Sequence, residues 1–232
     1  MREPVKAVVF DAVGTLLYAD PPVAAVYAEA GRQFGSRLDE PDVDARFRAA
    51  FARQEAIDAA QHAGRTGEPR ERDRWRSIVA DVFDDVTDGE ALFATLWQHF
   101  ARPEHWRLYD DVGPAWRRLS QQGFVLGIAS NFDRRLEVIC RGKPALADCR
   151  WLFISSQLGC RKPSPAFFQA IQDRLALPAA QVLVVGDDLE NDYRGALAAG
   201  CPAVLLDRHQ RYRLPGRVGS LAEICRITRA GT

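Results

Sequence analysis

The stretch VKAVVFDAVGTLLYADPP, residues 5–22, joins a short apolar run to one carboxylate in a glycine-containing turn. Residues 5–10 are mostly apolar and β-branched, which predicts a short buried strand. Asp11 follows that run directly, and Val13 stands two residues later, where a second carboxylate would complete an acid–base pair. The stretch therefore predicts a buried strand that delivers a single aspartate into a turn.

The segment from Pro21 to about Phe100 has a helical pattern. Apolar residues such as Val23, Val26 and Tyr27 fall on one face, and the spacing repeats further along the segment. This pattern predicts about four helices and no strands. We expect Trp75, Trp97 and Trp116 to be core residues, because each falls on an apolar face.

Beyond residue 105, strand-like runs alternate with helical ones. The strand-like runs are FVLGIAS, WLFIS, QVLVVGD and PAVLLD, and helices are expected from about Asp133, Pro165 and Leu189. Such alternation predicts right-handed crossovers and a parallel sheet, which the first strand must join because a lone strand is unstable. The predicted fold is α/β: a Rossmann-like core, residues 1–16 and 106–232, with an inserted all-helical cap, residues 17–105.

Composition excludes several functional classes. The 31 basic residues balance 31 acidic ones, so no global field would attract nucleic acid or an anionic membrane. The five cysteines are an odd number without C-x-x-C spacing, which argues against a disulfide framework and a zinc site. Neither a signal peptide nor an apolar run of roughly 20 residues is present. We therefore expect a cytoplasmic protein; the sequence does not indicate its oligomeric state.

Polar residues follow four of the predicted strands. Asp11 follows the first, Ser130 and Asn131 follow the second, and Lys162 lies a few residues past the third. Asp187 and Asp188 follow the fourth. Ligands of parallel sheets bind outside the carboxyl ends of the strands, so these residues predict a site at one edge of the sheet.

Four segments together resemble the motifs of the haloacid dehalogenase-like hydrolase superfamily. They are FDAVGTLL, GIASN, RKPSPAFF and VVGDDLENDYRGALAAG, in that order, and the inserted helices resemble the helical cap of the superfamily. The segment SNFDRRLE and the missing second aspartate are similar to the group called haloacid dehalogenase-like hydrolase domain-containing protein 3. The resemblance implies a phosphatase that acts on a small phosphorylated metabolite.

By this resemblance, Asp11 would be the nucleophile that forms an aspartyl-phosphate. Crowded carboxylates repel one another unless a cation lies among them, and Mg²⁺ is the usual hard cation beside phosphate. The resemblance implies Asp11, the backbone carbonyl of Val13 and Asp187 as Mg²⁺ ligands, with Asp192 orienting the site. Acids such as Asp192 are also common in the first turn of a helix.

The resemblance also implies Ser130, Asn131 and Lys162 as phosphate-binding residues, with Lys162 catalytic as well. Ser130 and Asn131 could equally cap the helix that follows, and the two roles are compatible. Lys162 could be a surface lysine, although the chain has only three lysines and uses arginine almost everywhere else. Ser164 could cap the helix expected from Pro165.

Val13 leaves the mechanism open, because it cannot protonate a leaving group or activate water. The sequence predicts a slow or selective hydrolase that favours good leaving groups. The alternative is a non-catalytic phosphate- and metal-binding module that acts through protein contacts. Metal-free dehalogenation is disfavoured because GDDLEND keeps its acids, and phosphonate cleavage is disfavoured because the cap has no lysine. We expect the arginines of GRTGEPRERDRWR and DRHQRYR to form solvated faces rather than bind an anionic substrate.

Overall fold

The computed structural model describes residues 4–214 and 216–230, and its centre is a parallel five-stranded sheet. The strand order is β5-β4-β1-β6-β7, so the first strand of the chain is the middle strand of the sheet. In β1, Ala7 lies opposite Val125 of β4 and Val182 of β6. The predicted α/β class with a Rossmann-like sheet is confirmed. The strands are β1 (Ala7–Phe10), β4 (Val125–Ser130), β5 (Trp151–Ile154), β6 (Val182–Gly186) and β7 (Ala203–Leu205).

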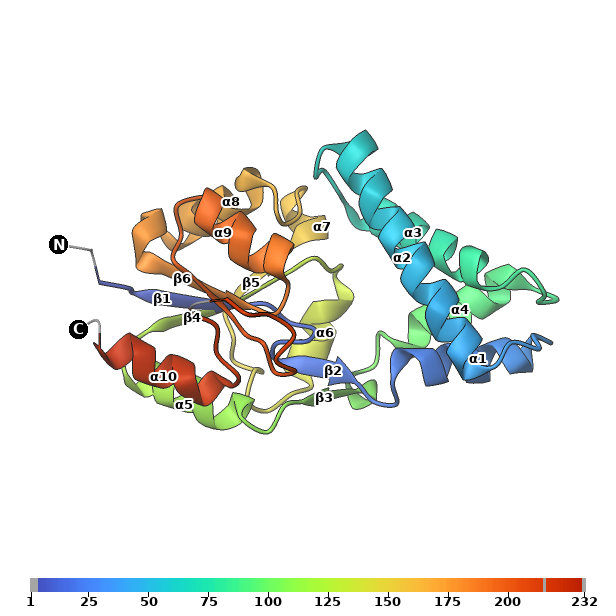
Figure 1. Cartoon of the computed structure of the whole chain (residues 1–232), viewed down its shortest axis with the longest axis horizontal. Helices are drawn as coiled ribbons and strands as arrows, with labels where there is room; N and C mark the ends of the chain where they lie inside the picture. The colour runs from blue at the N-terminus through green and yellow to red at the C-terminus, as the bar shows by residue number, and fades with distance from the viewer. Residues whose placement is uncertain (1–3, 215, 231–232) are drawn as a thin grey trace.

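Helices cover both faces of the sheet (Figure 1). Val8 and Phe10 of β1 pack into a core with α5, α6 and α10, whereas Ala7 and Val9 pack into a second core with α7, α8 and α9. Because both faces are buried, β1 is a continuous apolar run rather than an alternating one. The helices are α5 (Val112–Gln121), α6 (Arg135–Arg141), α7 (Ser155–Leu158), α8 (Pro165–Leu175), α9 (Gly195–Ala198) and α10 (Leu221–Ala230).

Four helices between β1 and α5 form a separate block with its own hydrophobic core (Figure 1). The chain enters this block through β2 (Leu17–Ala19) and leaves it through β3 (Trp106–Leu108), and the two strands pair antiparallel. The predicted domain boundary at residues 16–17 would assign β2 to the cap and its partner β3 to the core. The helices are α1 (Val23–Gln33), α2 (Glu40–His62), α3 (Glu68–Val82) and α4 (Gly89–His99).

Helix boundaries differ locally from the sequence-based expectations. The helix expected from about Asp133 begins at Arg135, with Arg134 at its N-cap. The helix expected from Leu189 begins as a π-helical turn, η3 (Leu189–Arg194), and continues as α9. Helix α8 does begin at Pro165, but the Ser164 side chain makes no capping hydrogen bond. Two short 3₁₀ turns complete the structure, η1 (Pro103–His105) and η2 (Ala179–Gln181).

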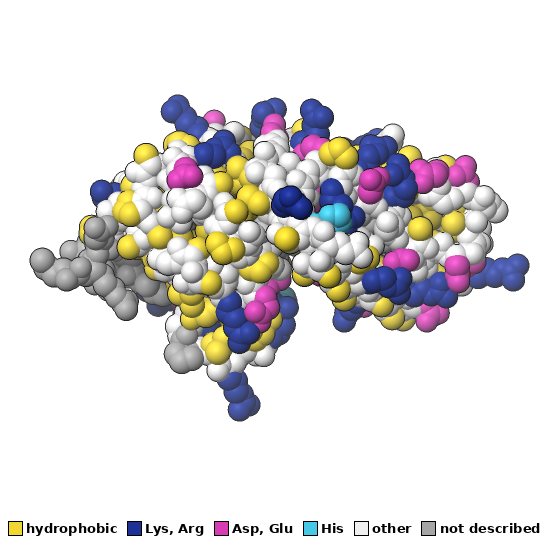
Figure 2. Space-filling view, turned by 90° about the horizontal axis from the view of Figure 1, so that it is seen from above, with side chains coloured by type: hydrophobic (Ala, Val, Ile, Leu, Met, Phe, Trp, Pro, Cys, Tyr) yellow, Lys and Arg dark blue, Asp and Glu magenta, His cyan; other side chains and the backbone are white. Residues whose placement is uncertain are grey.

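Charged side chains are interspersed over the surface shown in Figure 2, where basic and acidic groups lie side by side over much of the helical block. Within the described residues, none of the helices is long and apolar enough to cross a membrane. The five cysteines are free thiols.

Candidate active site

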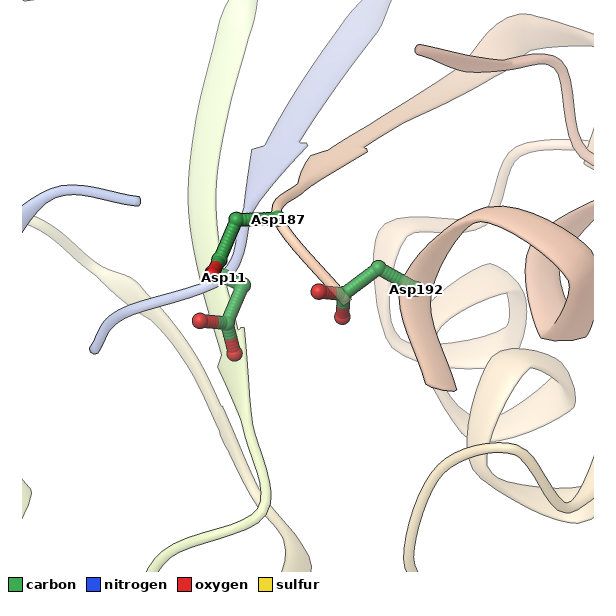
Figure 3. A group of neighbouring side chains, drawn as sticks. All are labelled: Asp11, Asp187 and Asp192. Atoms are coloured by element: carbon green, nitrogen blue, oxygen red, sulfur yellow. The ribbon is translucent and has the colours of Figure 1, made fainter. Parts of the chain in front are cut away.

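Three carboxylates meet at the edge of the sheet where the strands end. Asp11 lies just past β1, Asp187 just past β6, and Asp192 in η3, with ligand oxygens within 4.8 Å of one another. Figure 3 shows the three side chains converging. We call Asp11, Asp187 and Asp192 the carboxylate cluster. The structure thus brings together the two side chains expected to bind a metal and the one expected to orient them.

Lys162 lies inside the carboxylate cluster and is only 3% exposed. Its ammonium donates to Asp11 Oδ1 at 2.7 Å, to Asp192 Oδ1 at 2.5 Å and to the carbonyl of Ala129 at 2.8 Å. An ammonium has three N–H donors, so all of them are used here. Lys162 is therefore not a surface lysine. It fixes the Asp11 carboxylate, and donating to a phosphoryl oxygen would require it to exchange one of these acceptors.

Burial raises the pKa of each carboxylate in the cluster. For Asp11 the charge of Lys162 opposes this effect and that of Asp187 adds to it. The pKa of Asp192 rises to about 7 despite the opposing charge of Lys162. The pKa of Asp187 is raised by burial and then by Asp192. Burial alone would lower the pKa of Lys162, but Asp11 and Asp192 together raise it, so the lysine stays protonated.

The charge balance of the cluster fits a divalent cation. Three carboxylates contact or surround one buried ammonium, which leaves an excess of negative charge. Buried charges of one sign are costly unless a cation or protons compensate them, which is the condition that the raised pKa values reflect. Carboxylate oxygens are ligands that Mg²⁺ prefers. The residues present are therefore suited to hold that ion.

The turn after β1 is fitted closely to Asp187. Gly14 has φ +90°, and a Cβ on it would lie 2.5 Å from Asp187 Oδ1, so the position requires glycine. The hydroxyl of Thr15 donates to the same Oδ1 at 3.1 Å. We did not predict this role for Thr15, although its position directly after the turn glycine was a usable signal. The Val13 side chain is 40% exposed, so it faces outward rather than into the core.

Asp188 and Asp192, which follow β6, make different hydrogen bonds. Asp188 accepts hydrogen bonds from the backbone N–H groups of Glu190 and Asn191, so it caps η3. Asp192 Oδ2 accepts from the backbone N–H of Asp188 at 3.1 Å, while its other oxygen holds Lys162. A Cβ on Gly186 would lie 2.1 Å from Asp192 Oδ2, so glycine is needed for this approach. Asp192 thereby links Lys162 to the turn that carries Asp187.

Ser130 and Asn131 do not cap α6, because that helix begins at Arg135. Ser130 is the last residue of β4 and is buried. The Asn131 amide clamps the backbone of Lys162: Nδ2 donates to the Lys162 carbonyl at 3.0 Å, and Oδ1 accepts from its N–H at 2.8 Å. The Asn131 side chain thus supports the lysine, a role that the sequence did not reveal.

A second group of buried charges lies on the other side of the Lys162 loop. Asp58 of α2 accepts from Arg74 of α3 at 3.1 Å, from Arg70 at 2.6 Å and from Arg161. Glu55 also pairs with Arg74 and Arg161. We call these five residues the arginine cluster. The expectation of a solvated face is wrong for Arg74, which is buried because α2 and α3 pack together and place Asp58 opposite it.

Backbone contacts accompany the arginine cluster. The N–H of Arg161 donates to the carbonyl of Gly64 at 2.8 Å, and the N–H of Thr66 donates to the carbonyl of Gly159 at 3.1 Å. The connection between α2 and α3 therefore packs directly on the loop that carries Lys162. The helical block contacts the sheet domain here as well as through β2 and β3.

Comparison with known proteins assigns this chain to a family. A family profile described as haloacid dehalogenase-like hydrolase matches residues 5–200. The chain is 30% identical over 213 residues to haloacid dehalogenase-like hydrolase domain-containing protein 3 of Danio rerio, covering 90% of this chain and 87% of that protein. Over 121 residues, it is 31% identical to a ribulose-1,5-bisphosphate 5-phosphatase of Halopiger xanaduensis, covering 52% of this chain and 50% of that one.

Solved structures share the whole fold. The HAD-hydrolase YfnB of Bacillus subtilis, bound to magnesium, matches with a TM-score of 0.78 at 18% identity, covering 98% of this chain and 100% of that one. The L-2-haloacid dehalogenase of Xanthobacter autotrophicus matches with a TM-score of 0.74, also at 18% identity, covering 98% and 100%. The resemblance in the sequence motifs is confirmed, while the structural neighbours include proteins named as phosphatases and proteins named as dehalogenases.

Proposed function

Because this chain belongs to the haloacid dehalogenase-like hydrolase family, we propose that it is a Mg²⁺-dependent phosphatase with Asp11 as nucleophile. The observation that supports this most strongly is the setting of Asp11, which Lys162 holds at 2.7 Å beside two further carboxylates. The proposed substrate is a small phosphorylated metabolite. The phosphatase named among its relatives is consistent with this reaction.

In the proposed reaction, an Asp11 oxygen attacks phosphorus. A bond forms between that oxygen and phosphorus, and the bond from phosphorus to the leaving oxygen breaks. Water then attacks the phosphorus of the aspartyl-phosphate, which releases phosphate and regenerates Asp11. Lys162 keeps Asp11 oriented throughout, and Ser130 and Asn131 are the proposed contacts of the phosphoryl group.

Asp11, Asp187 and the backbone carbonyl of Val13 would hold Mg²⁺. When bound, the ion would neutralise charge on the transferring phosphoryl group. Because a backbone carbonyl is the ligand proposed at position 13, the valine side chain does not prevent metal binding.

The compartment of the protein is proposed to be the cytoplasm.

Val13 would make the proposed enzyme slow or selective. A valine side chain has no proton to give, so the leaving oxygen must take its proton from solvent or from another side chain, such as one of the cap. A positioned acid or base contributes typically about 10²–10⁴-fold. Acyl and aryl phosphates need little protonation on departure and would be cleaved best.

Val13, in place of the second aspartate, also supports a second candidate. This is a binding module that keeps the phosphate and metal sites but does not hydrolyse a substrate. The dehalogenases among the structural neighbours raise a third chemistry, but their likeness is to the fold. The carboxylate cluster, with its excess negative charge, suits a metal-dependent reaction better than attack on a 2-haloacid by a lone aspartate.

Phosphate release from acetyl phosphate and from an aryl phosphate tests the proposal, with and without Mg²⁺. We expect Asp11→Asn to lower the Mg²⁺-dependent rate by at least about 10³-fold, because it removes the nucleophile. Wild type and Asp11→Asn both at background would favour the binding module. Chloride release from 2-chloropropionate by the wild type alone would identify a dehalogenase instead.

A further inference from the structure

The loop DRHQRYR, residues 207–213, follows β7 and lies at the same edge of the sheet as the carboxylate cluster. Its shape depends on Asp207, whose fully buried carboxylate accepts from the backbone N–H of Arg211 at 2.8 Å and of Tyr212 at 2.9 Å. Side-chain oxygens that bind the backbone a few residues ahead fix a loop conformation. Arg211 therefore projects from an anchored loop.

Arg211 reaches the carboxylate cluster from the solvent side. Its guanidinium lies 3.6 Å from Asp187 Oδ2 and donates to the Asp187 carbonyl at 3.5 Å, while its side chain stays 49% exposed. Tight charge pairs have N–O distances of about 2.7–2.9 Å, so this pairing is loose. Its Nε also lies 3.9 Å from Asp207 Oδ1, and its guanidinium carbon lies 5.4 Å from the centre of the Tyr212 ring. Neither contact is a hydrogen bond, so most of the five N–H donors of the guanidinium remain available to another acceptor.

Arg217 pairs with Asp207 at 3.5 Å, away from Asp187, and the two cations nearest the turn after β1 are already paired. Lys162 uses its three donors on protein oxygens. Arg208 is 13% exposed and pairs with both carboxylate oxygens of Asp111, at 2.9 and 3.0 Å, and with the Thr15 carbonyl at 2.9 Å. Among these cations, Arg211 alone offers an exposed, weakly paired guanidinium next to a residue of the carboxylate cluster.

We propose that Arg211 determines substrate specificity by binding a second anionic group of the substrate, a carboxylate or a second phosphate. The inference rests on the proposed function, which places the phosphoryl group at Asp11. The planar guanidinium fork matches both kinds of anionic group. The substrate class is then a small carbon skeleton with a phosphoryl group at one end and a second acidic group a short spacer away.

Non-hydrolysable phosphonates test this inference without turnover. The Kd values of propylphosphonate and 3-phosphonopropionate, which differ by one carboxylate, are measured by calorimetry with Mg²⁺ in fixed excess. Ethylene-1,2-diphosphonate tests a second phosphate in place of the carboxylate. We expect at least one of the two doubly anionic compounds to bind the wild type about tenfold more tightly than propylphosphonate, about 1.4 kcal/mol. The tighter of the two identifies the preferred group.

Two variants make the measurement specific. Arg211→Ala should reduce the preference for the doubly anionic compound to about one while changing the Kd of propylphosphonate little. Arg213→Ala is the matched control, because it removes the same charge from an exposed position of the same loop and should keep the preference.

Three outcomes overturn the inference. The first is a wild type without preference for either doubly anionic compound, and the second is an Arg211→Ala variant that retains the preference. The third is equal weakening of all the phosphonates in Arg211→Ala, which would assign Arg211 to the phosphoryl or cation site. If the wild type binds no phosphonate, the phosphoryl site of the proposed function fails, and this inference fails with it.

Discussion

Two clusters of buried charge lie on either side of one peptide bond. Lys162 enters the carboxylate cluster, and its neighbour Arg161 enters the arginine cluster. In the first, two carboxylates contact one ammonium and the third, Asp187, lies beside them with the exposed Arg211 loosely attached. In the second, three guanidiniums surround two carboxylates, and Arg70 and Glu55 are partly exposed.

The two clusters differ in how completely their charges are paired with opposite charges of the same cluster. Buried charges are costly unless they are paired and hydrogen-bonded. Each acid of the arginine cluster contacts at least two guanidiniums, although the Nε atoms of Arg74 and Arg161 have no partner in the described structure. The arginine cluster has one positive charge in excess, three against two, but each of its charges contacts at least one opposite charge. The carboxylate cluster has two negative charges in excess, three against one, and Asp187 does not contact Lys162. A charge that the protein leaves without an opposite charge in firm contact indicates a ligand site, whereas a set in which every charge is paired indicates a structural contact.

The largest expected effect comes from enlarging that surplus. Val13→Asp should raise turnover of substrates with poor leaving groups by about 10²–10⁴-fold, because it adds a general acid. The position is 40% exposed, so the new carboxylate need not be buried. Rates measured over a series of alkyl and aryl phosphates should depend less steeply on leaving-group basicity than in the wild type. An unchanged slope in a folded, Mg²⁺-binding variant would mean that the missing acid does not limit the enzyme.

Next in size is the loss of one acid from each cluster. Asp58→Asn should lower the free energy of unfolding by about 3–5 kcal/mol, because it leaves three guanidiniums without their shared counter-ion. Asp187→Asn should raise the stability of the cation-free protein, because it relieves repulsion within the carboxylate cluster. Chemical denaturation without Mg²⁺ compares the two variants. Equal destabilisation by both would remove the distinction between the clusters.

A smaller effect should follow from supplying the cation. At a Mg²⁺ concentration of 100 times Kd, binding to the folded state stabilises it by about 2.7 kcal/mol. For a chain of this size we expect a rise in Tm of about 5 °C or more. Thermal unfolding with and without Mg²⁺ measures it. Asp187→Asn should lose most of the rise, and Asp58→Asn should keep it. A rise of the same size in both variants would place the ion elsewhere.

A fourth effect concerns pH. Burial raises the pKa of Asp192 to about 7 from an ordinary value of 3.8. Between these values the folded, cation-free chain holds a proton that the unfolded chain has released, so this residue's contribution to stability falls as pH rises. Other carboxylates titrate in the same range. The difference between wild type and Asp192→Asn therefore isolates the contribution of Asp192 to the dependence of stability on pH. The Tm difference between them should change across pH 4–7; a constant difference would contradict the raised pKa.

Much of the fold followed from the sequence, because burial on both faces leaves a continuous apolar run and the four polar segments all follow strands. The approach of Asp11, Lys162 and Asp187 could be predicted for the same reason. The arginine cluster could not, because periodicity shows which face of α3 is polar but not that Asp58 of α2 lies against it. The contact of the Asn131 amide with the Lys162 backbone could not be predicted either. Residue types do not show how long the turn between β4 and α6 is, so they are equally consistent with Asn131 as the cap of that helix.

The docking of residues 64–66 onto residues 159–161 limits how the helical block could be exchanged for another. A chimera with a foreign block would retain Arg161 but lose both of its acidic partners, Glu55 and Asp58. The adjacent Lys162 would keep its contacts with Asp11, Asp192, Ala129 and Asn131, which all belong to the sheet domain, but the residue before it would carry an unpaired buried charge. Recombination between distant relatives should therefore succeed only where the incoming block supplies its own acids at this contact.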